Sequence, residues 1–165
     1  MKKILFAISL GIVLIACGKD DDSNALPTTD SFMKASVAGK QLNVSGPGSP
    51  TDQKGCTSIF DSSDNTLYLY GNDGIVFINI AIANFPKATG EFALGGIDTE
   101  RVGNYTDDTD SANPVNYYST SGKLTVTKYS ASAVEGTFEF KAYNSTLKKE
   151  VTVTGGEFKV PFTAI

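Results

Sequence analysis

Beyond residue 31, apolar side chains tend to recur at every second position, with polar side chains between them. The clearest case is the segment 134–142, where Val134, Phe138 and Ala142 fall on one side and charged residues and Thr fall on the other. This period of two is typical of a β-strand with one buried face and one face in water. Apolar residues do not recur at the helical spacing over two turns in this part of the chain. The pattern therefore predicts a succession of strands with little helix in this part of the chain.

Clusters of Gly, Asn, Asp and Ser separate the other apolar runs. The expected strands cover 32–37, 40–44, 58–60, 67–70, 75–83, 123–129, 134–142, 151–154 and 158–162. Ala38-Gly39 and Gly155-Gly156 each separate two strands by two residues, which is the spacing of a β-hairpin. Many short strands with frequent turns predict an all-β fold, an antiparallel β-sandwich, with a lipocalin-like β-barrel as the alternative.

Three segments depart from simple alternation. Both faces of 75–83 are apolar, so we expect a central strand that is buried on both sides, with Asn79 as a buried amide whose hydrogen bonds are satisfied. The stretch 98–114 is polar and acidic, and we expect an exposed loop there. Pro161 lacks an N–H donor, so the last strand is expected to lie at an edge or to end irregularly.

The first 17 residues have a different pattern. Lys2 and Lys3 precede an apolar run over 4–15, and Leu14-Ile15-Ala16-Cys17 follows with small residues at its end. A basic start, an apolar stretch and a small-residue cleavage site are the parts of an export signal, here residues 1–16. A membrane-spanning helix needs about 20 apolar residues, and this run is too short.

The residues around Cys17 carry a more specific resemblance. Leu-Ile-Ala-Cys resembles the lipobox of bacterial lipoproteins, which implies a diacylglyceryl group on Cys17 and attachment to the membrane by lipid. Lys19, Asp20 and Asp21 resemble the surface-export signal of Bacteroidota lipoproteins, which implies an outer-membrane protein facing the cell exterior. The alternative is that this acidic run, within 17–30, is simply a solvated tether.

Other segments resemble small uncharacterised Bacteroidota lipoproteins more loosely. They are the strand and turn patterns at 121–127, 134–140 and 151–158, and the Ala35-Ser36-Val37-Ala38-Gly39-Lys40 opening. The resemblance implies a β fold and a cell-envelope address, and it brings no catalytic residue with it.

Composition limits the partners and the chemistry. Lys2 and Lys3 are two of the 14 basic residues, so without the leader 12 basic side chains face 18 acidic ones, a formal charge of −6. That charge argues against nucleic acid as a partner, because nucleic acid requires cationic patches. Residues 31–165 are of the right length for a single domain. Cys56 is the one cysteine beyond Cys17, so no disulfide is possible within the mature chain, and we expect it to be a buried apolar residue.

The chain contains no histidine, which excludes Ser-His-Asp and Cys-His catalysis and histidine metal ligands. No cofactor is expected. Asp107, Asp108 and Asp110 offer hard oxygen ligands of the kind calcium takes, but they do not match the EF-hand spacing, so they are at most a weak calcium candidate.

Tyrosines are the remaining candidates for ligand contact. Tyr105 lies within the expected long loop, Tyr117 and Tyr118 follow it, and Tyr68 and Tyr70 share the face opposite the apolar residues of their strand. Tyrosine is amphipathic and forms contact surfaces for sugars and proteins. We therefore expect a non-enzymatic surface domain that binds an unknown protein or glycan. The alternatives are a glycan or small-hydrophobe binder and, third, an enzyme that uses carboxylates alone.

Overall fold

The computed structural model describes residues 30–48 and 54–165, and these form ten strands and no helix. The strands are β1 (Phe32–Val37), β2 (Lys40–Ser45), β3 (Gly55–Asp61), β4 (Thr66–Asn72), β5 (Val76–Ile82), β6 (Gly90–Leu94), β7 (Arg101–Asp107), β8 (Val115–Tyr129), β9 (Ala133–Asn144) and β10 (Lys149–Ala164). The described part of the chain has no helix of the length and apolarity that crossing a membrane requires. The predicted all-β class is confirmed.

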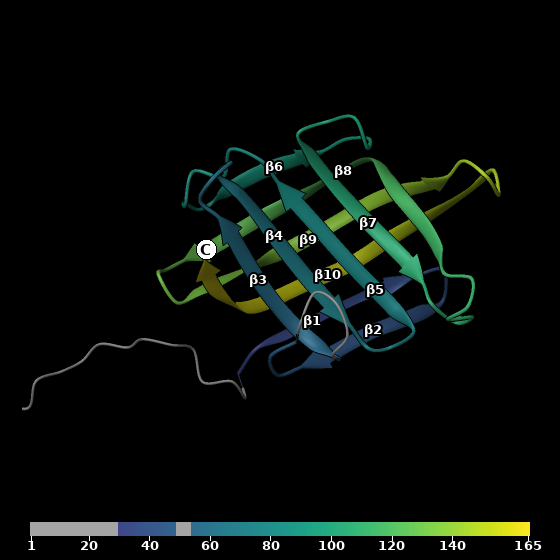
Figure 1. Ribbon diagram of the computed structural model, residues 1–165, viewed down its shortest axis with the longest axis horizontal. Coiled ribbons are helices and arrows are strands. Elements are labelled where there is room, and N and C mark those ends of the chain that lie inside the picture. The colour runs from purple at the N-terminus through teal and green to yellow at the C-terminus, as the bar shows by residue number, and fades with distance from the viewer. Residues whose placement is uncertain (1–29, 49–53) are drawn as a thin grey trace, which may run out of the picture.

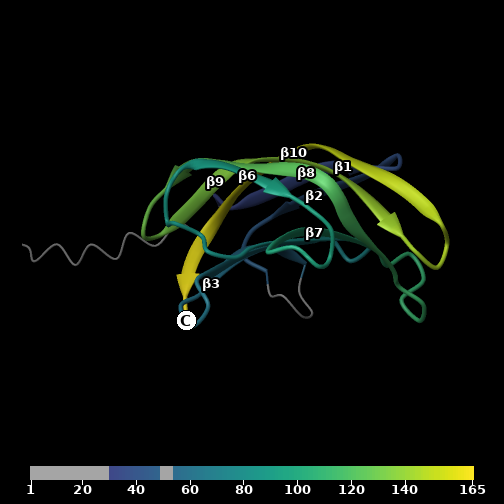
Figure 2. The same cartoon turned by 90° about the horizontal axis from the view of Figure 1, so that it is seen from above.

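The strands lie in two layers (Figures 1 and 2). The front layer contains β3, β4, β5 and β7, and the back layer contains β6, β8, β9, β10, β1 and β2. Strands of one layer run across those of the other, as Figure 1 shows. The side chains between the layers form the core, in which Phe60, Ile80 and Phe158 are at most 1% exposed.

Two long strands belong to both layers and join them. β8 pairs with β7 through residues 115–118 and then continues in the back layer beside β6 and β9. β10 pairs with β9 through Pro161, and residues 162–164 then run parallel to β3. The strands β3, β4, β5, β7, β8, β9 and β10 therefore close a hydrogen-bonded ring. The fold combines features of both expected alternatives, the sandwich and the barrel. Pro161 lies at this junction between the layers.

The turn at Ala38-Gly39 is confirmed, but the hairpin at Gly155-Gly156 is wrong. Ala38 and Gly39 have φ of 49° and 83°, as a two-residue hairpin of type I′ requires, and they join β1 to β2. Gly155 has φ of 60° within the continuous strand β10, where the register with β9 shifts between Val153 and Gly156. It is a β-bulge, and the extra residue keeps Val153 and Phe158 on the inner face although they are five positions apart.

The exposed loop expected over 98–114 is also wrong in part, because β7 lies inside it. The inward positions of β7 include Gly103 and Tyr105, both buried. Gly103 packs against the ring of Phe140, where an added Cβ would lie 3.1 Å from the ring carbons. A glycine at an inward position carries no hydrophobic signal, and so the alternation was hidden.

The central strand β5 is buried on one face rather than on both. It lies between β4 and β7, as predicted, and its inner side chains, Val76, Ile78, Ile80 and Ile82, are at most 1% exposed. Its outer side chains, Phe77, Asn79 and Ala81, are half-buried. The layers described here leave the outer face of β5 uncovered.

Candidate functional site

Between residues 57 and 106, the outward positions of β3, β4, β5 and β7 carry one charged side chain, Asp61 at the end of β3. We call the uncharged remainder of this surface the front face. It consists of half-buried outward side chains: Thr57, Ile59, Tyr68, Tyr70, Asn72, Phe77, Asn79, Ala81, Val102, Asn104 and Thr106.

Strand register arranges these side chains in rows across the sheet. One row runs from Tyr70 to Asn79, to Asn104 and then to Tyr118 of β8. The next row runs from Tyr68 to Ala81 and Val102. Directly opposite residues have Cβ atoms about 5 Å apart. Each row is therefore a continuous line of contact positions.

The aromatic rings of the front face lie nearly parallel to one another. The ring centroids of Tyr68 and Tyr70 are 6.2 Å apart with 16° between the ring planes, and those of Tyr70 and Phe77 are 6.3 Å apart with 25°. Burial, with a smaller contribution from Tyr68, raises the pKa of Tyr70. The Tyr70 hydroxyl therefore stays protonated and neutral at physiological pH.

The amide side chains of the front face differ in how well they are satisfied. Thr106 donates its hydroxyl to Asn104 Oδ1 at 3.0 Å or to Asn116 Oδ1 at 2.7 Å, and Asn104 Nδ2 lies 3.3 Å from the carbonyl of Tyr117. In contrast, Asn79 Oδ1 is buried and has no hydrogen-bond partner among the described residues. The expectation of a satisfied amide at Asn79 is therefore wrong. A buried acceptor without a partner costs about 1–3 kcal/mol.

The outer surface of the back layer is different in character. Lys–Glu ion pairs cross its strands: Lys34–Glu157 at 2.6 Å, Lys123–Glu91 at 3.1 Å, Lys128–Glu135 at 3.2 Å and Lys141–Glu150 at 3.7 Å. Thr and Ser occupy many of the positions between them. This is the composition of a sheet face that meets water. The two outer surfaces of one domain are thus built for different surroundings.

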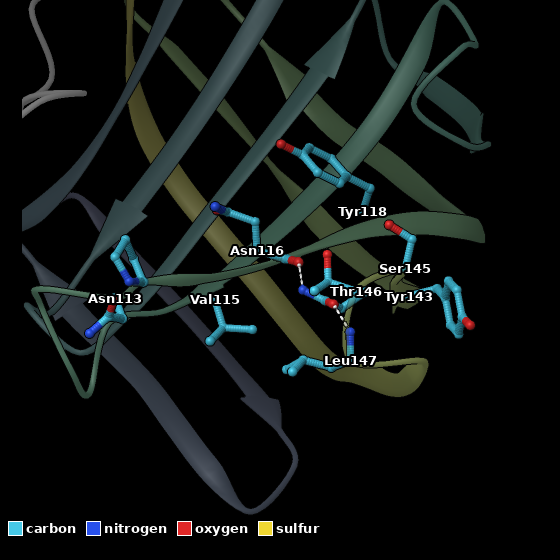
Figure 3. A pocket seen from close by; sticks show the side chains of 10 residues that line it. Asn113, Val115, Asn116, Tyr118, Tyr143, Ser145, Thr146 and Leu147 are labelled. Carbon is cyan, nitrogen blue, oxygen red and sulfur yellow. Dashed lines mark hydrogen bonds between the residues drawn. The ribbon is translucent and has the colours of Figure 1, made fainter.

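An open hollow of about 490 Å³ lies beside the Tyr118 end of the front face. We call it the end hollow, and Figure 3 shows it between the β7–β8 loop and the β9–β10 hairpin. Its lining residues are Asn113, Pro114, Val115, Asn116, Tyr118, Tyr143, Asn144, Ser145, Thr146 and Leu147. Asn144 holds the two sides together, because its Nδ2 donates to the carbonyl of Asn116 at 2.7 Å and its Oδ1 accepts from Leu147 N–H at 2.6 Å. None of the lining residues is charged.

The structure separates the three tyrosines that the sequence grouped. Tyr118 is 39% exposed, but Tyr105 and Tyr117 are 1% and 4% exposed, and their rings stack in the core at 5.4 Å between centroids. Burial is the main cause that raises the pKa of Tyr105, with the nearby carboxylate of Asp107 adding to it. A surface site made by all three is therefore wrong, because Tyr105 and Tyr117 occupy inward strand positions. Tyr143, which the sequence did not single out, lies opposite Tyr118 instead and is also 39% exposed.

The acidic residues of the β7–β8 loop do not converge. Within the described residues, no group of three or more acidic or cysteine side chains is close enough to hold a metal ion. Asp107 is paired with Lys40, whose Nζ lies 2.6 Å from both carboxylate oxygens, and Asp110 accepts from Asn113. Burial alone would raise the pKa of Asp107, but hydrogen bonds from Lys40 and Thr109 lower it to about 2. Asp108 joins neither contact, so the weak calcium candidate gains no support.

The two cysteines have separate outcomes. Cys56 is fully buried, and burial raises the pKa of its thiol to about 11, so it is a core residue as expected. Cys17, Lys19, Asp20 and Asp21 lie outside the described residues, and their assignment stays a prediction.

Comparison with known protein families identifies one match. The sequence model of a Domain of unknown function (DUF6252) matches residues 56–161, which is more than half of the chain. The chain belongs to this family. Searches of curated proteins and of solved structures give no match. The DUF6252 segment extends from β3 into β10 and contains every residue of the front face, but residues 162–164 of β10, which close the ring by pairing with β3, follow it.

Proposed function

We propose that this DUF6252 protein is a lipoprotein, anchored to the outer membrane by lipid on Cys17, whose β domain is a non-enzymatic binding module on the cell exterior. The module binds its partner through the front face. The observation that carries this proposal is the contrast between an uncharged aromatic front face and a back layer crossed by Lys–Glu pairs.

The composition of the front face favours contact with another molecule over contact with water. Contact surfaces are depleted in charged residues at their centre and enriched in aromatic ones. Tyr68, Tyr70 and Phe77 form such a centre, and charged side chains are absent from the rows around them. Contiguous uncharged surface of this kind on a soluble domain marks an interaction site.

The other two functions receive less support. The space between the layers is filled by the core, which leaves a small hydrophobe no route to an interior site through Phe60, Ile80 or Phe158. An enzyme that uses carboxylates alone would need two acidic groups facing each other across the site, and the front face and the end hollow contain none.

The proposed lipid attachment and surface location are tested on living cells. Radiolabelled palmitate should label the wild-type chain and not the Cys17→Ser variant. Protease added to intact cells should release the domain, and replacement of Lys19, Asp20 and Asp21 by Ala should abolish that release while the labelling persists. Labelling of the Cys17→Ser variant would refute the anchor, and unchanged release would refute the export signal.

The proposed binding role is tested by hydroxyl-radical footprinting of the full chain, on intact cells and as purified protein in detergent. Phe77 and Phe32 form a matched pair, because both are half-buried and outward, one on the front layer and one on the back layer. We expect oxidation of Phe77, Tyr68 and Tyr70 to fall at least threefold on cells relative to the purified protein, while oxidation of Phe32 stays the same. Equal oxidation of Phe77 in both preparations would show that the front face has no partner.

A further inference from the structure

We infer that the partner of the front face is a neutral polysaccharide, lying along the row from Tyr70 through Asn79 and Asn104 to Tyr118 and continuing into the end hollow. This inference rests on the proposed function and names the ligand class.

Charge is the first argument. The rows of Tyr68, Tyr70 and Phe77 offer no carboxylate to a cationic ligand, since Asp61 lies outside them at the end of β3, and they offer no Lys or Arg to an anionic ligand. The mature chain also carries a net negative charge, which repels anionic polymers. An uncharged ligand binds such a surface without the free-energy cost of removing water from a charged group of the protein.

The aromatic rings supply the second argument. A pyranose ring presents a flat face of C–H groups and a rim of hydroxyls, and the C–H face packs on an aromatic ring. Tyr68 and Phe77 lie in the rows on either side of Tyr70, with ring planes 16° and 25° apart, so a sugar unit at the Tyr70 end of the row meets three rings of similar orientation. The tyrosine hydroxyls remain available to the sugar rim.

The amides supply the third argument. A sugar hydroxyl both donates and accepts, and an amide side chain does the same. Asn79 Oδ1 is buried without a partner among the described residues, directly between Tyr70 and Asn104 in the row. Asn79 as a whole is half-buried, so a rotation of its amide group toward the outer surface would let a ligand hydroxyl over the row donate to Oδ1. Binding of a hydroxyl-rich ligand thereby removes a cost that the free protein carries.

The open form of the site supplies the fourth argument, since it suits a long chain better than a small molecule. Tyr118 is both the last residue of the row and part of the lining of the end hollow, so the two adjoin at this residue. The hollow is lined by Asn, Ser, Thr and Tyr, together with Pro, Val and Leu, and has no charge. The same chemistry therefore continues from the sheet into the hollow (Figure 3), as a polymer of repeating neutral units requires.

The test is native affinity electrophoresis of the detergent-solubilised full chain in gels that contain one soluble polysaccharide each. The neutral probes are dextran, galactomannan, xyloglucan and laminarin, and the anionic probes are polygalacturonate and heparin. We expect at least one neutral probe to retard the protein and neither anionic probe to do so. Tyr70→Ala should weaken the retardation at least tenfold, whereas Tyr70→Phe should keep it within about threefold, because Phe keeps the ring that packs on the sugar and loses only the hydroxyl.

Two further variants guard against misfolding and misassignment. Tyr118→Ala changes an exposed side chain at the end of the row and should also weaken retardation while leaving the unfolding midpoint unchanged. Phe32→Ala, on the back layer, should leave retardation as in the wild type.

Three results would overturn the inference. They are no retardation by any neutral probe, stronger retardation by an anionic one, and retardation that survives both Tyr70→Ala and Tyr118→Ala. A dimer in sedimentation that Tyr70→Ala disperses would likewise assign the face to a second copy of the chain. If Phe77 is nevertheless protected on cells, the binding role stands and only the ligand class is wrong.

Discussion

Replacement of Ser119 by alanine should measurably destabilise the domain. Ser119 is 1% exposed, in β8 next to Tyr118. Its hydroxyl donates to the carbonyl of Gly95 after β6 and accepts the N–H of Gly103 in β7, at 2.8 Å. The backbone pairing of β7 with β8 extends only to Asn104 and Tyr118, so the side chain replaces the next backbone partner. One hydroxyl thus joins three segments beside the candidate site.

The expected loss follows from the burial of the two partners. Gly103 is buried, so in the Ser119→Ala variant water cannot reach its N–H. An unsatisfied buried group of this kind costs about 1–3 kcal/mol. Gly95 is half-buried, and water can reach its carbonyl, so only the net value of a hydrogen bond, about 1 kcal/mol, is lost there. Ser119→Ala should therefore lower the free energy of unfolding by about 2–4 kcal/mol.

Urea unfolding of the full chain in detergent, followed by circular dichroism, measures this loss. Ser121→Ala is the matched control, because it removes the same hydroxyl from an exposed position of the same strand and should change stability by less than about 0.5 kcal/mol. The slope against urea should stay the same in both variants, and the amide of Gly103 should exchange its hydrogen faster in Ser119→Ala only. Equal stability of the two variants would refute the reasoning.

Three other predictions concern the core and the surface ion pair. Gly136→Ala places a Cβ 2.0 Å from the carbonyl of Thr125, a contact that needs a backbone shift, and should cost about 2–3 kcal/mol in urea unfolding; a loss under 1 kcal/mol would contradict it. Asp107 has its pKa lowered from 3.8 to about 2 in the folded chain, so its pairing with Lys40 stabilises the domain above about pH 4, and this contribution is lost as the pH falls toward 2. With solvent screening it is worth about 1 kcal/mol, measured as the difference between wild type and Asp107→Asn across that range, and identical pH profiles would exclude it. Cys56, with a pKa near 11, should react with a disulfide reagent at pH 8 only after unfolding, and rapid reaction of the folded chain would show that it is accessible.

Strand identity could be predicted wherever inward positions carried large apolar side chains. The alternation in 134–142 placed β9 correctly, with Phe138 and Phe140 at 3% and 2% exposure. Positive φ at both residues of Ala38-Gly39 was predictable from the two-residue spacing. In these segments local pattern and tertiary environment agree.

The errors arose where glycine occupies the core. Gly103 contributes no side chain, so β7 looked like part of a loop although its neighbour on the inner face is the ring of Phe140. Gly155 adopts the left-handed conformation that suits a hairpin turn and a bulge equally well. The register of β10 with β9 distinguishes the bulge from the turn, and this register depends on tertiary pairing that the local sequence does not reveal.

The candidate site could be predicted only in part for a similar reason. Adjacent residues in a strand point to opposite sides, so Tyr117 and Tyr118 cannot both face a ligand, and only the register reveals which of them does. Tyr68 and Tyr70 were placed correctly on the face opposite the core. The second apolar face of β5 was the strongest signal of the site, but it was interpreted as burial, because pattern alone does not distinguish a covered face from an unoccupied one.

The place of the proposed anchor bears on how the front face would be used. The described chain begins at Asp30, whose carboxylate lies 3.2 Å from Lys159 Nζ, and β1 then joins the back layer beside β10. Twelve residues lie between Cys17 and Asp30, and the thirteen Cα–Cα steps reach at most about 45 Å when fully extended. A lipid on Cys17 would therefore hold the domain within about 45 Å of the membrane, by a tether that joins the back layer. Because the front face lies on the opposite layer, anchoring and binding do not compete for the same surface, and a polymer outside the cell could lie along the row of Tyr70, Asn79 and Asn104 while the domain stays attached.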